Sequence, residues 1–107
     1  MKRFGQVIKL KPDKIEEYKE LHRNVWPEIK TLIQECNIKN YSIFFKDNTL
    51  FAYFEYVGTD YEKDMEKMAN DSVNQKWWSV CKPCQMPLET ANKGEWWADM
   101  EEVFYLD

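Results

Sequence analysis

The chain of 107 residues fits a single domain, residues 1–107. Its 15 basic and 19 acidic residues give a net charge of −4 with no basic face, so we expect neither nucleic acid nor an anionic membrane as a partner. No run approaches the ~18 consecutive apolar residues of a membrane span. The first residues lack a signal-peptide pattern and three cysteines give no sign of secretion, so a cytoplasmic location is expected.

Aromatic side chains are frequent for so short a chain, with 5 Trp, 6 Tyr and 6 Phe. One small core hides only part of this number. The excess indicates a pocket, a partner surface or both.

The first third of the chain predicts a strand over residues 3–11 and then helix. The helical stripe contains residues spaced alternately by three and four: Ile15, Tyr18, His22, Val25, Ile29, Leu32 and Cys36. Pro27 interrupts the stripe because proline lacks the amide hydrogen and collides with the carbonyl four residues back. Either the helix kinks near Trp26, or a second helix begins with Pro27 in its first turn.

Two further strands are expected at residues 40–46 and 49–57, joined by a tight turn at Asp47-Asn48. Thr59 or Asp60 then caps a helix.

That helix breaks near Asn70-Asp71 and resumes through Val80. Residues 82–97 are expected to form a loop, and residues 101–106 a last strand. The order of elements predicts an α+β fold, the ferredoxin-like βαββαβ pattern with an antiparallel four-stranded sheet.

The strands also carry apolar residues on both faces, since neighbouring Phe44 and Phe45 point in opposite directions. Two helices cover one face of such a sheet. The other face needs a second cover, and we therefore predict a homodimer with sheets packed face to face.

His22 is the single histidine of the chain and lies within the helical stripe. Its unperturbed pKa near ~6.5 suits it to accept and donate protons at neutral pH. A core histidine bonded to a backbone carbonyl is an equally good interpretation. Tyr18, one turn earlier, lies on the same helix face and can reach the same cavity.

Adjacent indoles occur at Trp77-Trp78, where neighbouring helical residues point about 100° apart. One can pack inward while the other lines a cleft and stacks on a sugar ring, although two core or interface anchors fit the pattern better. Trp96-Trp97, in the expected loop, fit a site or a dimer seam.

The Cys81-x-x-Cys84 spacing indicates neither metal nor redox chemistry in this setting. Zinc needs about four ligands, and beyond these two only Cys36 and His22 remain. The strand-to-helix context of a redox dithiol is also missing. We therefore predict no metal site.

Four blocks of the sequence form a specific combination: Glu17, Tyr18, His22 and Trp26-Pro27-Glu28; Asn40–Ile43; Gln75, Trp77 and Trp78; and Glu101–Leu106. In their order and spacing, across nearly the whole chain, they resemble the L-rhamnose mutarotase family.

The resemblance implies a dimeric α/β barrel and an isomerase that interconverts the α and β anomers of L-rhamnose without a cofactor. The family's catalytic histidine matches His22, and its sugar-binding residues match Tyr18, Tyr41, Trp77 and Trp78. Residues 82–97 fit the family less well and leave open L-fucose or another aldose as the sugar. Whether a second group shares the proton transfer also stays open.

Two alternatives remain at this level. One is a cofactor-free small monooxygenase of the dimeric α+β barrel type, with His22 as its base. The other is a non-catalytic dimer that binds a small ligand or a partner protein. Fold alone does not choose among them.

Overall fold

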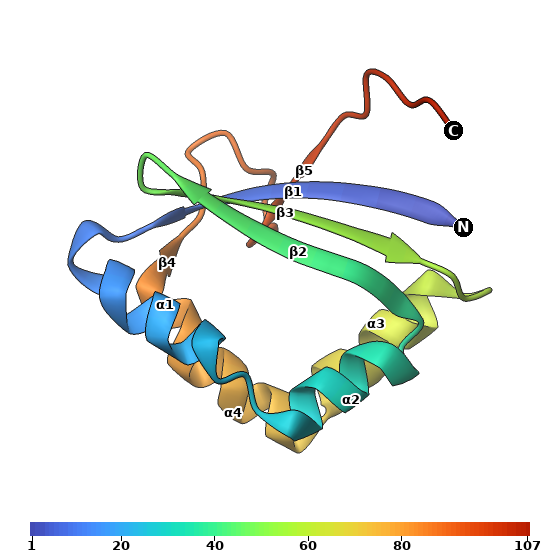
Figure 1. Cartoon of the computed structure of the whole chain (residues 1–107), viewed down its shortest axis with the longest axis horizontal. Helices are drawn as coiled ribbons and strands as arrows, with labels where there is room; N and C mark the ends of the chain where they lie inside the picture. Colours follow the sequence, from blue (N-terminus) through green and yellow to red (C-terminus); the bar gives the residue numbers. More distant parts are fainter.

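A computed structural model describes all 107 residues and shows one curled antiparallel sheet covered on one face by helices (Figure 1). In chain order the elements are β1 (Lys2–Leu10), a 3₁₀ turn (Pro12–Lys14), α1 (Ile15–Arg23), α2 (Pro27–Glu35), β2 (Ile38–Lys46), β3 (Thr49–Tyr56), α3 (Tyr61–Asn70), α4 (Ser72–Cys81), a second 3₁₀ turn (Lys82–Cys84), β4 (Gln85–Met86) and β5 (Ala98–Met100). None of the helices is long and apolar enough to cross a membrane.

The strands lie in the order β2-β3-β1, and the far edge of β1 is shared by two short strands. β4 pairs with the end of β1 at Lys9 and Leu10, and β5 pairs with its middle at residues 5–7. All pairs are antiparallel. The predicted α+β fold is therefore confirmed, with the fourth position of the sheet divided between β4 and β5.

Local signals placed most boundaries correctly. Pro27 stands in the first turn of α2, so the two-helix interpretation holds. The hairpin turn has left-handed backbone at Asp47 (φ 53°) and Asn48 (φ 57°), as tight hairpins require. Asp60 caps α3, and Asp71 caps α4 where the second helical segment breaks.

The predicted last strand is wrong. The strand is Ala98–Met100, whereas residues 101–107 pair with no strand and lead away from the sheet (Figure 1). Val103, Phe104 and Leu106 are 86%, 78% and 80% exposed. The composition of residues 101–106 is strand-like, but a strand forms only where a neighbour offers backbone partners. The expected loop over residues 82–97 likewise contains a 3₁₀ turn and β4.

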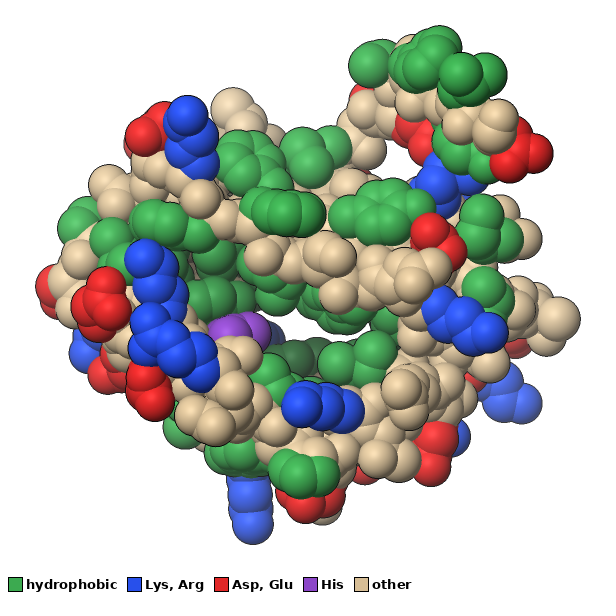
Figure 2. Space-filling view, in the orientation of Figure 1, with side chains coloured by type: hydrophobic (Ala, Val, Ile, Leu, Met, Phe, Trp, Pro, Cys, Tyr) green, Lys and Arg blue, Asp and Glu red, His purple; other side chains and the backbone are tan.

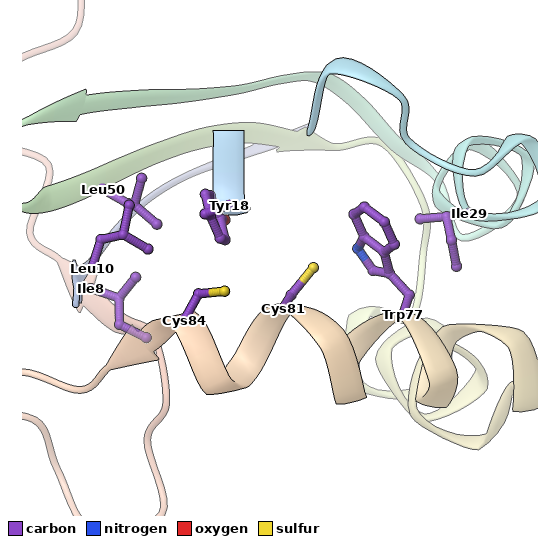
Figure 3. Packing of buried hydrophobic residues seen from close by; sticks show 8 residues of the cluster. All are labelled: Ile8, Leu10, Tyr18, Ile29, Leu50, Trp77, Cys81 and Cys84. Atoms are coloured by element: carbon purple, nitrogen blue, oxygen red, sulfur yellow. The ribbon is translucent and has the colours of Figure 1, made fainter. Parts of the chain in front are cut away.

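The core lies between the helices and the inner face of the sheet. Figure 3 shows Ile8, Leu10 and Leu50 of the sheet near Tyr18 of α1, with Cys81 and Trp77 projecting from α4. The outer face has no helix over it. Phe44 and Phe51 on that face are 66% and 39% exposed, as the two-faced strand pattern indicated.

Candidate active site

A cavity of about 830 Å³ opens between the helices and the inner face of β2. Figure 2 shows it as a hollow through the middle of the molecule, with the purple side chain of His22 on its wall. Apolar side chains from α2 and β2 form much of the lining, including Ile29, Ile33 and Ile43. The volume is sufficient for a monosaccharide-sized ligand.

His22 lies near the end of α1 with its imidazole tied on one side. Because a carbonyl only accepts, Nδ1 carries the proton and donates to the backbone oxygen of Tyr18 at 2.9 Å. Nε2 is then left with a lone pair and no protein partner. Burial lowers the pKa of His22 from 6.5, and the bond to the Tyr18 carbonyl opposes this in part. The imidazole is therefore neutral at pH 7, the form that accepts a proton.

Aromatic rings surround the imidazole. Tyr18 stacks on it with centroids 4.1 Å apart, and Trp77 meets it edge-on at 5.3 Å. Trp26 packs edge-on against Trp77 at 5.1 Å. These contacts fix the ring orientation of His22 and give the cavity an aromatic wall.

Tyr41 enters the same cavity from β2. Its ring lies 5.5 Å from that of Phe54, on the face of the sheet that the helices cover. The residue as a whole is 39% exposed, and desolvation at the cavity raises the pKa of Tyr41 to about 12. The hydroxyl stays protonated and can donate or accept a hydrogen bond.

Tyr18 and Trp78 take other positions. Tyr18 is only 4% exposed and lies beneath His22 rather than on the cavity wall. Trp78 points into a second, more open hollow of about 540 Å³, where the Lys82 ammonium lies 4.9 Å from its ring centre. The structure thus brings His22, Tyr41 and Trp77 together, and places the other two expected site residues apart from the cavity.

The buried Tyr18 hydroxyl is held by a short relay. Gln85 of β4 donates to it through Nε2 at 3.2 Å, and the indole N–H of Trp96 donates to Gln85 Oε1 at 2.7 Å. Trp96, which lies in the predicted loop, is therefore linked through Gln85 to the buried hydroxyl of Tyr18. Since Gln85 is 5% exposed, each of these bonds satisfies a group that has little access to water.

Three polar residues at the cavity were not predicted from the sequence: Lys30, Gln34 and Lys39. Asn40, which belongs to one of the four sequence blocks, also borders the cavity. No Asp or Glu lines the cavity. Lys30 and Gln34 follow each other at helical spacing, one turn apart on the face of α2 that carries the apolar lining. That spacing was the available signal.

The cysteines are free, buried and not activated. Burial raises the pKa of Cys81 to about 12 and that of Cys84 to about 11. The Cys84 thiol donates to Glu17 at 3.2 Å. No group of three or more His, Cys, Asp or Glu side chains lies together in an arrangement that could hold a metal ion. Both thiols of the C-x-x-C pair are protonated at neutral pH.

A curled antiparallel sheet, one layer of helices and a ring-lined cavity beside a neutral histidine define an α+β protein with a cavity that is large enough for a small molecule. The fold is shared with tetracenomycin F2 cyclase from Streptomyces glaucescens, at a TM-score of 0.71 and 13% identity over 100% of this chain and 98% of that one. At this identity the likeness shows the fold alone.

Closer relatives identify the family. A family model described as L-rhamnose mutarotase matches residues 3–106. The L-rhamnose mutarotase of Oceanobacillus iheyensis is 37% identical over 115 residues, with 100% of both chains covered. A crystal structure of an L-rhamnose mutarotase from Formosa agariphila gives a TM-score of 0.78 at 29% identity, again over 100% of both chains. The chain belongs to the L-rhamnose mutarotase family, which is a family of isomerases. This favours the mutarotase over the monooxygenase and the binding module.

Proposed function

We propose that the protein interconverts the α and β anomers of L-rhamnose, with His22 as the general acid and base. The observation that carries the proposal is an imidazole with one nitrogen tied and the other open, on the wall of a ring-lined cavity. Aromatic faces suit the apolar C–H faces of a pyranose. The names of the relatives supply the sugar.

In the proposed reaction, Nε2 of His22 accepts the proton of the anomeric hydroxyl as the bond between C1 and the ring oxygen breaks. C1 becomes an aldehyde, and the ring oxygen keeps the electron pair and takes the proton back from the imidazolium. After rotation about C1–C2 the steps run in reverse on the other face of the aldehyde. Protons and electrons balance without an oxidant, a reductant or a cofactor.

The surrounding side chains have separate roles in this proposal. Trp77 stacks against the sugar, and the Tyr41 hydroxyl orients one of its hydroxyl groups. Tyr18 supports the imidazole from beneath through the stack and the carbonyl bond. Trp78 makes no sugar contact, because it does not line the cavity.

Saturation-transfer NMR at the anomeric C1 proton tests the proposal, measured on L-rhamnose, L-fucose and other free aldoses. General acid–base catalysis contributes roughly 10²–10⁴-fold, and His22→Ala should lose most of this factor. His22→Gln is the matched variant, because its amide can still donate to the Tyr18 carbonyl but cannot exchange a proton with the sugar. Wild-type exchange in both folded variants would remove His22 from the catalytic role.

We also propose a homodimer in which the outer faces of two sheets pack together. Exposed apolar side chains on this face come from three strands, and Phe44, Phe51 and Met100 are 66%, 39% and 42% exposed. Several exposed apolar side chains on one uncovered sheet face are typical of a protein–protein contact. A second copy supplies a matching apolar surface, because a two-fold contact uses the same patch twice.

The cytoplasm is the proposed location of this single domain. All three cysteines, Cys36, Cys81 and Cys84, are free and buried. Free thiols persist in a reducing compartment.

A further inference from the structure

β2 carries one residue more than regular pairing with β3 allows. On either side of Phe54 the two strands pair in register, but two β2 residues, Asn40 and Tyr41, stand opposite Phe54 alone. This arrangement is a β-bulge, which re-aims the side chains that follow it.

The extra residue reverses the alternation of side chains along β2. Ile38, before the bulge, faces the helices and is buried. Regular alternation from Ile38 would turn Asn40 inward and would place Tyr41 and Ile43 on the outer face. With the bulge, Tyr41 and Ile43 both line the His22 cavity.

Asn40 has the backbone conformation that the bulge needs. Its φ is 51°, in the left-handed region that glycine prefers and that asparagine tolerates better than most residues. Its side chain lies on the outer face, where Nδ2 donates to Glu55 Oε1 at 2.9 Å. The second oxygen of Glu55 accepts from the Tyr53 hydroxyl at 2.7 Å. The hydrogen bond between Asn40 and Glu55 on the outer face thus holds Asn40 in place. Asn40 in turn orients Tyr41 into the cavity on the inner face.

We propose that Asn40 is a positioning residue of the sugar site: its left-handed backbone, clamped through Glu55 from the opposite face of the sheet, turns the Tyr41 hydroxyl toward His22. The inference rests on the proposed function for its effect on catalysis. It makes the sugar site depend on a backbone conformation in β2, and the bond to Glu55 on the opposite face supports that conformation.

Two substitutions separate the backbone conformation from the amide. Asn40→Gly keeps the left-handed conformation and loses the bond to Glu55, so kcat/KM for L-rhamnose should stay within ~3-fold of wild type. Asn40→Val opposes that conformation, and kcat/KM should fall by ~10-fold or more. Asn40→Ala opposes it less and replaces the valine variant if that variant does not fold. In a Tyr41→Phe background, neither change should lower kcat/KM further.

An NMR titration of the ¹³C-labelled tyrosines reports the environment of the Tyr41 hydroxyl independently of any activity measurement. The wild-type hydroxyl, with its pKa raised to about 12, should stay protonated at pH values where an unperturbed tyrosine, with a pKa near ~10, ionises. In Asn40→Val the Tyr41 signal, assigned with Tyr41→Phe, should titrate near ~10. Asn48→Val is the matched control, because Asn48 also has left-handed backbone (φ 57°) but lies in the hairpin turn. It should leave kcat/KM and the Tyr41 titration unchanged.

Three results would overturn the inference: a wild-type Tyr41 titration in Asn40→Val, equal losses of kcat/KM in Asn40→Gly and Asn40→Val, or losses that add to those of Tyr41→Phe. Failure of the proposed function is a separate outcome. In that case His22→Gln and Tyr41→Phe keep wild-type exchange while the titration still moves in Asn40→Val.

Discussion

In α1, Nδ1–H of His22 donates a 2.9 Å hydrogen bond to the Tyr18 carbonyl, and the two rings stack 4.1 Å apart. The bond sets which nitrogen carries the proton, and the stack sets the direction of the ring. A core histidine makes the same kind of bond to a carbonyl. Here that bond leaves Nε2 as the acceptor, so the bond of a core histidine is compatible with the catalytic role that we propose for His22.

The pH dependence of exchange follows from the lowered pKa of His22. The neutral imidazole is the base, so kcat/KM should be level above about pH 7 and should fall as the pH drops through the lowered pKa. Initial rates of anomer exchange, corrected for the spontaneous reaction, measure this profile. His22→Gln should show no such fall, and an enzymatic rate that rises on acidification would contradict the assignment.

The same titration should appear in stability. The unfolded chain protonates its histidine at about 6.5, before the folded chain does, so it binds more protons in the window below that pH. The free energy of unfolding should therefore decrease on acidification from pH 6.5 to the folded-state pKa. Urea unfolding of wild type and His22→Gln at several pH values isolates this contribution, and parallel curves would contradict it.

Trp77→Phe should weaken sugar binding more than it slows turnover. Phenylalanine retains part of the stacking face of Trp77 but fills less of the wall, so we expect KM to rise by ~3–10-fold with a smaller change in kcat. Trp78→Phe is the matched control one residue away, in the second hollow. Its KM should stay within ~2-fold of wild type. A larger KM effect from Trp78 than from Trp77 would reverse the assignment.

Gln85→Leu should destabilise the fold. The substitution leaves the Trp96 indole N–H without its acceptor and the buried Tyr18 hydroxyl without a donor. Each buried polar group left unsatisfied costs about 1–3 kcal/mol, so chemical denaturation should show a loss of this order or more. The exposed Gln75, which donates to the Ala69 carbonyl, provides the control. Gln75→Leu should change stability by less than about 1 kcal/mol, and equal losses in the two variants would argue against the relay.

Phe44→Arg should disrupt the proposed dimer. A charge at this 66% exposed position would be buried without a partner between two sheets. Light scattering should then report the chain mass of 13.0 kDa instead of twice that value. Glu66→Arg on the exposed surface of α3 should keep the dimer. A wild-type protein that is monomeric at micromolar concentration would contradict the proposal.

Much of the fold could be predicted because its signals are local. The three-and-four spacing around His22 defines a helix face, Pro27 divides it, and Asp60 and Asp71 cap the helices that follow. These signals act within a few residues, where backbone geometry and capping decide the outcome. They also placed His22 on the inward-facing surface of its helix.

The sequence by itself thus determined most of the elements and the single histidine, which is the side chain suited to proton exchange near neutral pH. Only the tertiary structure decided which side chains meet that group. The bulge at Asn40 depends on the register of β2 against β3. The last strand forms at residues 98–100 because β1 pairs with them there. The packing of α4 places Trp77, and not Trp78, on the cavity wall. Each outcome depends on contacts between segments far apart in the chain. The periodicity within one segment does not specify which other segment pairs or packs with it.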